Sequence, residues 1–68
     1  NHYMTEEQIK YRASQGEVET SKYMQLVMKV YGKLADENQD FNKLNDDDKL
    51  LKAFEVTDSI LEENHKKR

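Results

Sequence analysis

The sequence contains no cysteine and no proline, and glycine occurs only at Gly16 and Gly32. Without cysteine, neither a disulfide nor a thiolate metal site can stabilise the chain. So little glycine and proline argues against a turn-rich β fold and against a glycine-rich phosphate-binding loop. The longest unbroken apolar run is three residues, too short to span a membrane, and no secretory leader is visible.

Large apolar residues are also scarce. Ile, Leu, Val and Phe make up 14 of 68 residues, which is close to the composition at which chains fail to fold alone. A domain of this size buries only about 60% of the surface that its unfolded chain exposes. We therefore expect one domain, residues 1–68, that gains stability by pairing with a second copy. Because the sequence begins with Asn1 and not Met, we expect a domain excised from a longer protein.

The first half of the chain carries the signals of two helices. Thr5 followed three residues later by Gln8 has the form of a capping box. Gly16 is a typical helix stop, so we expect a first helix at residues 5–15. Apolar residues then recur with a period of 3.6 over residues 20–36, which predicts a second helix. Its cap would be one of two hydroxyl residues, Thr20 or Ser21.

A third helix is expected after residue 45. Residues 37–44 are polar except for Phe41 and Leu44, and they form either an ordered loop held by Phe41 or one extra helical turn. Asn45 would cap the third helix, and three aspartates follow in its first turn, where carboxylates favour the positive end of the helix dipole. The fold class is therefore all-α, with three helices.

The third helix carries two apolar arcs instead of one. Leu50, Phe54 and Leu61 lie within about 40° of each other and form the first arc. Ala53, Val56 and Ile60 form the second arc, about 100° around the helix. A short three-helix chain has few elements to cover both arcs. Half-exposed packing is one interpretation of the second arc; the other is a helix that crosses a two-fold axis. The expected dimer interface is Leu50, Ala53, Phe54, Val56, Ile60 and Leu61.

Charge is unevenly distributed, although the formal net charge is only −3. Residues 36–48 hold six carboxylates and one lysine. On the second helix, three lysines and one glutamine fall within an arc of about 80° opposite the apolar residues. This arc is either a solvated polar face or a stripe of phosphate contacts, joined by the basic residues of the first helix and the chain end. The expected nucleic-acid contacts are Lys10, Arg12, Lys22, Lys29, Lys33, Lys66, Lys67 and Arg68.

Catalytic and metal-binding signals are weak. His2 and His65 lie at opposite ends of the chain and have no ligand spacing. The three aspartates at 46–48 lack the glycine and glutamate of a calcium-binding loop, which favours helix capping as their role. We therefore expect no enzyme activity, no metal ion and no cofactor.

The all-helical layout, the length and the ending Asn64-His65-Lys66-Lys67-Arg68 resemble a known family. It is the C-terminal functional domain of the membrane-associated DNA replication organiser of small Bacillus podophages, the Salasvirus group. The resemblance implies a homeodomain-like fold that forms an intertwined helical dimer and higher multimers. It also implies binding of single- and double-stranded DNA without sequence preference, contact with the protein primer on the genome ends, and location at the cytoplasmic face of the host membrane through an N-terminal anchor in the parent chain.

The third helix departs from a homeodomain recognition helix. Such a helix presents Asn and Arg to base edges, whereas this one carries Glu55, Asp58, Glu62 and Glu63. Contact with DNA is therefore expected through lysines and phosphates. Two other hypotheses stay open: a module that binds a partner protein through its acidic surface without binding DNA, and a purely structural oligomerisation domain.

Overall fold

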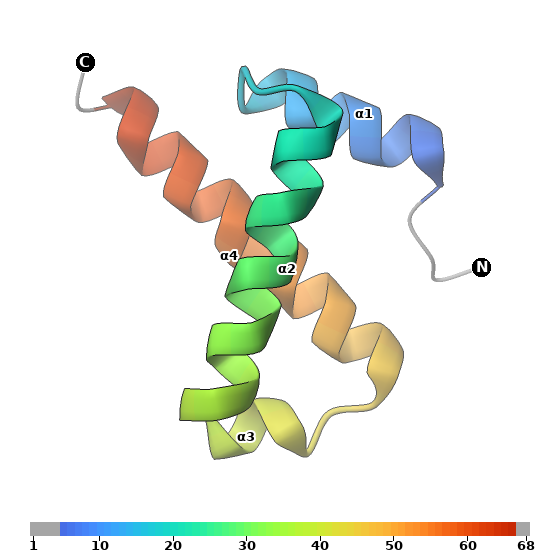
Figure 1. Ribbon diagram of the computed structural model, residues 1–68, viewed down its shortest axis with the longest axis vertical. Helices are drawn as coiled ribbons and strands as arrows, with labels where there is room; N and C mark the ends of the chain where they lie inside the picture. The colour runs from blue at the N-terminus through green and yellow to red at the C-terminus, as the bar shows by residue number, and fades with distance from the viewer. Residues whose placement is uncertain (1–4, 67–68) are drawn as a thin grey trace.

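The computed structural model describes residues 5–66, with the backbone alone at Lys66. Within this range helices are the only regular secondary structure, which confirms the all-α class. Its four helices are α1 (Glu6–Gln15), α2 (Thr20–Glu37), α3 (Gln39–Asn42) and α4 (Asp46–Lys66) (Figure 1). The single-turn α3 is the extra turn that the sequence allowed around Phe41.

Local signals set the ends of α1. The Thr5 Oγ1 accepts a hydrogen bond from the Gln8 N–H at 3.2 Å, and the Thr5 N–H donates to Gln8 Oε1 at 3.2 Å, so the predicted capping box is confirmed. The helix ends at Gln15, as expected, but Gly16 has a right-handed φ of −85°. The left-handed residue of the corner is Glu17, with φ 58°.

The predicted cap of α2 is wrong and that of α4 is confirmed. Glu19 occupies the N-cap position of α2 and makes no side-chain capping bond, because Thr20 already lies inside the helix. The backbone N–H of Tyr23 still bonds to the Glu19 carbonyl at 2.8 Å. At α4, Asn45 Oδ1 accepts from the Asp48 N–H at 2.8 Å.

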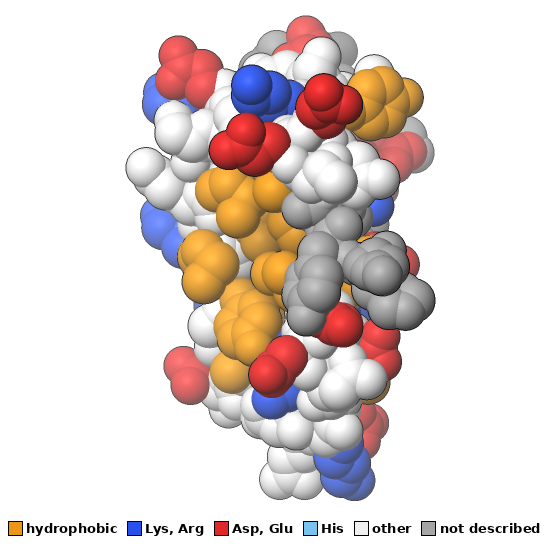
Figure 2. All heavy atoms as spheres, turned by 90° about the vertical axis from the view of Figure 1, so that its right-hand side faces the viewer, with side chains coloured by type: hydrophobic (Ala, Val, Ile, Leu, Met, Phe, Trp, Pro, Cys, Tyr) orange, Lys and Arg blue, Asp and Glu red, His pale blue; other side chains and the backbone are white. Residues whose placement is uncertain are grey.

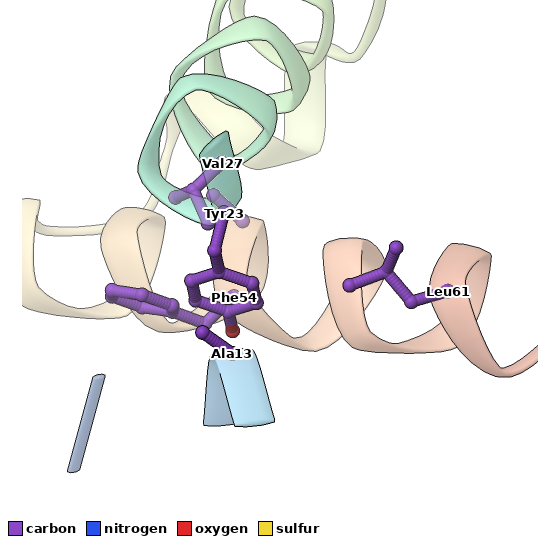
Figure 3. Close-up of a cluster of buried hydrophobic side chains, with 6 residues drawn as sticks. Ala13, Tyr23, Val27, Phe54 and Leu61 are labelled. Carbon is purple, nitrogen blue, oxygen red and sulfur yellow. The ribbon is translucent and has the colours of Figure 1, made fainter. Parts of the chain in front are cut away.

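The core lies where α2 crosses α4, with α1 packed against the start of α2 (Figures 1 and 3). Its buried apolar residues come from all three long helices: Ala13, Tyr23, Val27, Ala53, Phe54 and Leu61. Thr57 is also buried, and its hydroxyl donates to the Ala53 carbonyl at 2.7 Å, so this polar group is satisfied within its own helix.

Helix α3 closes the end of the molecule that lies away from α1 (Figure 1). Phe41 is only 3% exposed and meets the ring of Tyr31 edge-on, with centroids 5.3 Å apart. Asn38 caps α3 by accepting from the Phe41 N–H at 3.0 Å. Phe41 therefore anchors this polar segment, which forms the helical turn and not the ordered loop that was the other alternative.

The molecule is thin, with principal extents of 34 × 29 × 16 Å. The shortest dimension corresponds to two crossed helices, whose axes pack about 8–10 Å apart, so α2 and α4 cover each other on one side only. Among the described residues, no helix combines the length and the apolar character needed to cross a membrane.

Candidate nucleic-acid interface

Three lysines project from the face of α2 that lies opposite its buried side. Lys22, Lys29 and Lys33 are all exposed, whereas Tyr23 and Val27 of the same helix are fully buried. The ion pairs Arg12–Asp58, Lys43–Asp40 and His65–Glu17 involve none of the three lysines, and no carboxylate of the described residues is paired with them. We call these three residues the α2 lysine stripe.

Other exposed residues share this face of α2. Asp36 lies near its C-terminal end, three residues after Lys33. Gly32 lies between Lys29 and Lys33 in sequence and at the edge of the stripe on the helix surface, and a Cβ atom placed on it would have no other group within 4 Å. The face is thus a cationic surface with a bare segment of helix backbone beside it.

The two expected basic contacts on α1 differ in their surroundings. Lys10 is exposed. Arg12 instead pairs with the Asp58 carboxylate of α4, and its guanidinium lies 5.7 Å from the centre of the Phe54 ring. The guanidinium of Arg12 is therefore engaged inside the fold, which leaves Lys10 as the free cation of this helix.

Asp58 also accepts a hydrogen bond from Tyr23, so three helices meet at one carboxylate. The Tyr23 O–H donates to Asp58 Oδ1 at 2.5 Å, and its ring stacks on Phe54 with centroids 6.0 Å apart. Burial, together with the hydrogen bond to the Asp58 carboxylate, raises the pKa of the Tyr23 phenol far above its usual value. The sequence analysis missed this group because its members are far apart in the chain and share no local spacing.

The C-terminal basic residues are only partly within the described range. Lys67 and Arg68 lie outside it, as does the side chain of Lys66. His65 is described: one ring nitrogen, Nε2, lies 2.8 Å from the Gly16 carbonyl oxygen, and Nδ1 lies 3.3 Å from Glu17 Oε2. His65 thereby joins the end of α4 to the corner between α1 and α2.

The expected dimer-interface residues divide into two groups. Ala53, Phe54 and Leu61 are buried in the core of the single chain, where they cover α1 and α2, so they are not free to face a second copy. Leu50 packs at the edge of this core and is half-buried. Val56 is also half-buried, and Ile60 is 45% exposed.

Val56 and Ile60 lie in a shallow depression on the outer face of α4. Its other lining residues are Lys52, Glu55, Ser59, Glu63 and Asn64. All of them come from the same helix, so nothing else in the described chain covers this surface. We call it the outer α4 face; its apolar members and two of its carboxylates, Glu55 and Glu63, were noted from the sequence, but not that they share one surface.

A second view shows where apolar and charged side chains lie on the side of the molecule formed by α1 and the first half of α4. Figure 2 shows hydrophobic side chains gathered at the centre of this side, with acidic and basic side chains around them. Ile9 of α1 and Leu50 of α4 are half-buried residues that pack against the core. The thin fold therefore leaves part of its core margin open to solvent.

No group of three or more His, Cys, Asp or Glu side chains suited to a metal ion occurs among the described residues. The two candidate binding surfaces of the described residues are the α2 lysine stripe and the outer α4 face. Comparison with protein-family models, with curated proteins and with solved structures gave no match to this chain.

Proposed function

We propose that this chain is a sequence-independent DNA-binding and oligomerisation module. The observation that carries the proposal is the α2 lysine stripe: three exposed cations on one helix face, none of them paired within the described chain. Each lysine that neutralises a phosphate releases counterions, and this source of affinity does not depend on base sequence.

The spacing of the stripe suits a run of phosphates. Lys29 and Lys33 are one helical turn apart, about 6 Å along the axis, and Lys22 lies about 10 Å further towards the N-terminus. Lys10 would add a fourth cation from α1. Arg12 is not part of the proposed interface, because Asp58 and Phe54 already engage its guanidinium.

A single copy would bind weakly, because the chain carries a net charge of −3 and an acidic end. Two linked copies would present two stripes to one DNA molecule and add their contacts. Pairing of copies is therefore the second half of the proposal, and the outer α4 face supports it.

The charges of the outer α4 face are self-complementary. In an antiparallel pair of α4 helices around a two-fold axis near residue 58, Lys52 of one copy lies beside Glu63 of the other, and Val56 approaches Ile60. A parallel pair would oppose Lys52 with Lys52. The pattern thus favours an antiparallel dimer through Val56 and Ile60, while Ala53, Phe54 and Leu61 remain in each core.

The resemblance noted from the sequence supplies a biological setting for this proposal. It would make the chain a homeodomain-like domain that organises viral DNA replication at the host membrane and contacts the protein primer at the genome ends. Glu55 and Glu63 project from the outer face of α4. Phosphates would be repelled there, so α2, and not α4, would face the DNA.

Fluorescence anisotropy with random-sequence duplex and single-stranded DNA, at two or more salt concentrations, tests the DNA-binding half. We expect binding that weakens steeply with salt, with a similar affinity for different sequences. Replacing Lys29→Gln and Lys33→Gln together should reduce the slope of the logarithm of the binding constant against the logarithm of salt by about 2.

Lys43 provides the matched control. It is exposed on the loop after α3, where it pairs with Asp40 at 3.8 Å, and it lies outside the stripe. The Lys43→Gln variant should bind DNA with nearly the wild-type affinity. Equal losses for Lys43→Gln and for a single stripe replacement would instead indicate a non-specific charge effect.

The alternative function is binding of a basic partner protein through the acidic end of the molecule. The exposed carboxylates of Asp36, Glu37, Asp40, Asp46 and Asp48 favour it. It predicts no DNA binding at low salt, and loss of the partner when the aspartates at 46–48 are replaced by asparagine.

A further inference from the structure

Gly32 is a glycine that the fold of the single chain does not require. It lies inside α2, where glycine is less favourable than alanine by about 1 kcal/mol. Its φ is not positive, so no special backbone conformation demands it. A Cβ atom placed on Gly32 would meet nothing within 4 Å, so no close packing demands it either. Gly16 is different, because a Cβ there would lie 2.6 Å from the Leu61 side chain.

The side chains around Gly32 indicate what kind of partner could approach its exposed backbone. Lys29 precedes it by three residues and Lys33 follows it directly, so at 100° per residue Lys29 lies about 60° and Lys33 about 100° around the helix on the same side of Gly32. The space left by the missing side chain therefore borders the stripe and its unpaired cations. On the other side the gap borders Met28, which is 55% exposed. A partner that approaches here reaches the helix backbone while it remains within range of both ammonium groups.

Charge decides which partner fits this gap. A second α2 helix could also approach closely at a glycine, but it would bring the lysines of one copy against those of the other. A polyanion gains from the same lysines. Asp36, one turn after Gly32 on the same face, repels an anion and so limits the favourable region to the side of Lys29.

We propose that Gly32 is the point of closest approach between α2 and the sugar–phosphate backbone of DNA, with Lys29 and Lys33 both reaching the bound strand from the same side of the glycine. The contact is steric: the absent side chain lets the strand lie against the helix, while the backbone N–H of Gly32 keeps its helical hydrogen bond. This inference rests on the proposed DNA-binding function and assigns the exposed glycine a role in it.

The test depends on two changes in opposite directions: substitutions of Gly32 should increase the stability of the fold and decrease the affinity for DNA. Gly32→Ala and Gly32→Gln should both raise the urea midpoint, because alanine and glutamine favour helix and have open space here. Both should nevertheless weaken DNA binding, by about threefold for alanine and about tenfold for glutamine, equivalent to roughly 0.7 and 1.4 kcal/mol. The same enlargement at exposed Ser14 of α1, Ser14→Gln, is the control and should leave affinity unchanged.

The outcomes separate the two proposals. If the wild-type chain binds DNA and both Gly32 variants bind equally well, the role of Gly32 is overturned while the proposed function stands. If the wild-type chain fails to bind DNA at low salt, both are overturned. A weaker variant that is also less helical by circular dichroism would count against the steric argument, because the substitutions must leave the fold intact.

Discussion

Asp58 holds two helices to α4 through the two oxygens of one carboxylate. Tyr23 of α2 donates to Oδ1, and Arg12 of α1 pairs with Oδ2. The Arg12 and Asp58 side chains are 28% and 35% exposed, so solvent screens the ion pair and its contribution is about 1 kcal/mol. The phenol of Tyr23 is fully buried, and its hydrogen bond to a charged acceptor is the stronger link.

The first prediction concerns alkaline pH. Because the pKa of Tyr23 is higher in the folded chain than in the unfolded one, its contribution to stability is fully present below the unfolded pKa of about 10. That contribution is lost as the pH rises above this value. The free energy of unfolding in urea should therefore fall above about pH 10, and the fall should be shallower in Tyr23→Phe.

The comparison with Tyr23→Phe isolates the phenol of Tyr23, because every other ionisable group is present in both proteins. Tyr11→Phe serves as the control, since Tyr11 is 65% exposed and lies outside the core. At neutral pH, Tyr23→Phe should also lose about 2 kcal/mol of stability with its hydrogen bond to a charged group. Parallel pH curves for Tyr23→Phe and the wild type would contradict this account.

At the scale of elements, the two sides of α4 differ in what they contact. Its inner side completes the core with Ala53, Phe54 and Leu61, and its outer side stays uncovered in the single chain. Its C-terminal turns also reach the α1–α2 corner, where Leu61 packs against Gly16. The position of α1 therefore depends on a close contact at a residue without a side chain.

The second prediction is that Gly16→Ala destabilises the fold although alanine suits the backbone there. A Cβ at residue 16 would lie 2.6 Å from Leu61 Cδ1, so the largely buried Leu61 side chain has to move. We expect a net loss of about 1 kcal/mol in urea unfolding, because the strain exceeds the entropic gain from replacing glycine. A stability gain like that expected for Gly32→Ala would contradict the close contact.

The elements were predictable from the sequence to the extent that their signals are local. The Thr5 capping box, the Asn45 cap and the apolar period of α2 each depend on residues within a few positions, and all are confirmed. Thr20 failed as a cap because the chain had already turned into the helix after Glu19. Propensity alone did not reveal this geometry.

The candidate interface was predictable only in part, for the same reason. The lysine stripe follows from helical periodicity on one element. The engagement of Arg12 does not, because Asp58 lies 46 residues away in sequence. The division of α4 between core and outer face likewise depends on where α1 and α2 pack, so the apolar arcs indicated two faces without showing which residues each would bury.

At the scale of the whole molecule, the third prediction is self-association through the outer α4 face. A chain only 16 Å thick has a small core, and pairing would cover apolar surface on α4. Analytical ultracentrifugation should give twice the chain mass of 8.1 kDa for the wild type. Ile60→Glu should give the single-chain mass with an unchanged helical spectrum.

Leu51→Glu is the matched control for this experiment. Leu51 is 42% exposed on α4, close to the 45% of Ile60, but it does not line the depression. The dimer should therefore persist in Leu51→Glu. A wild-type chain that remains a stable monomer at high concentration would exclude the dimer, and equal dissociation by both variants would exclude this face as its site.

The long span between α1 and its partners on α4 has a consequence for how the chain is made. Arg12 meets Asp58 across 46 residues, and Gly16 meets His65 across 49. During synthesis α1 leaves the ribosome well before these partners on α4. Its contacts with α2 can form earlier, whereas the part of α1 that faces α4 stays uncovered until α4 has emerged.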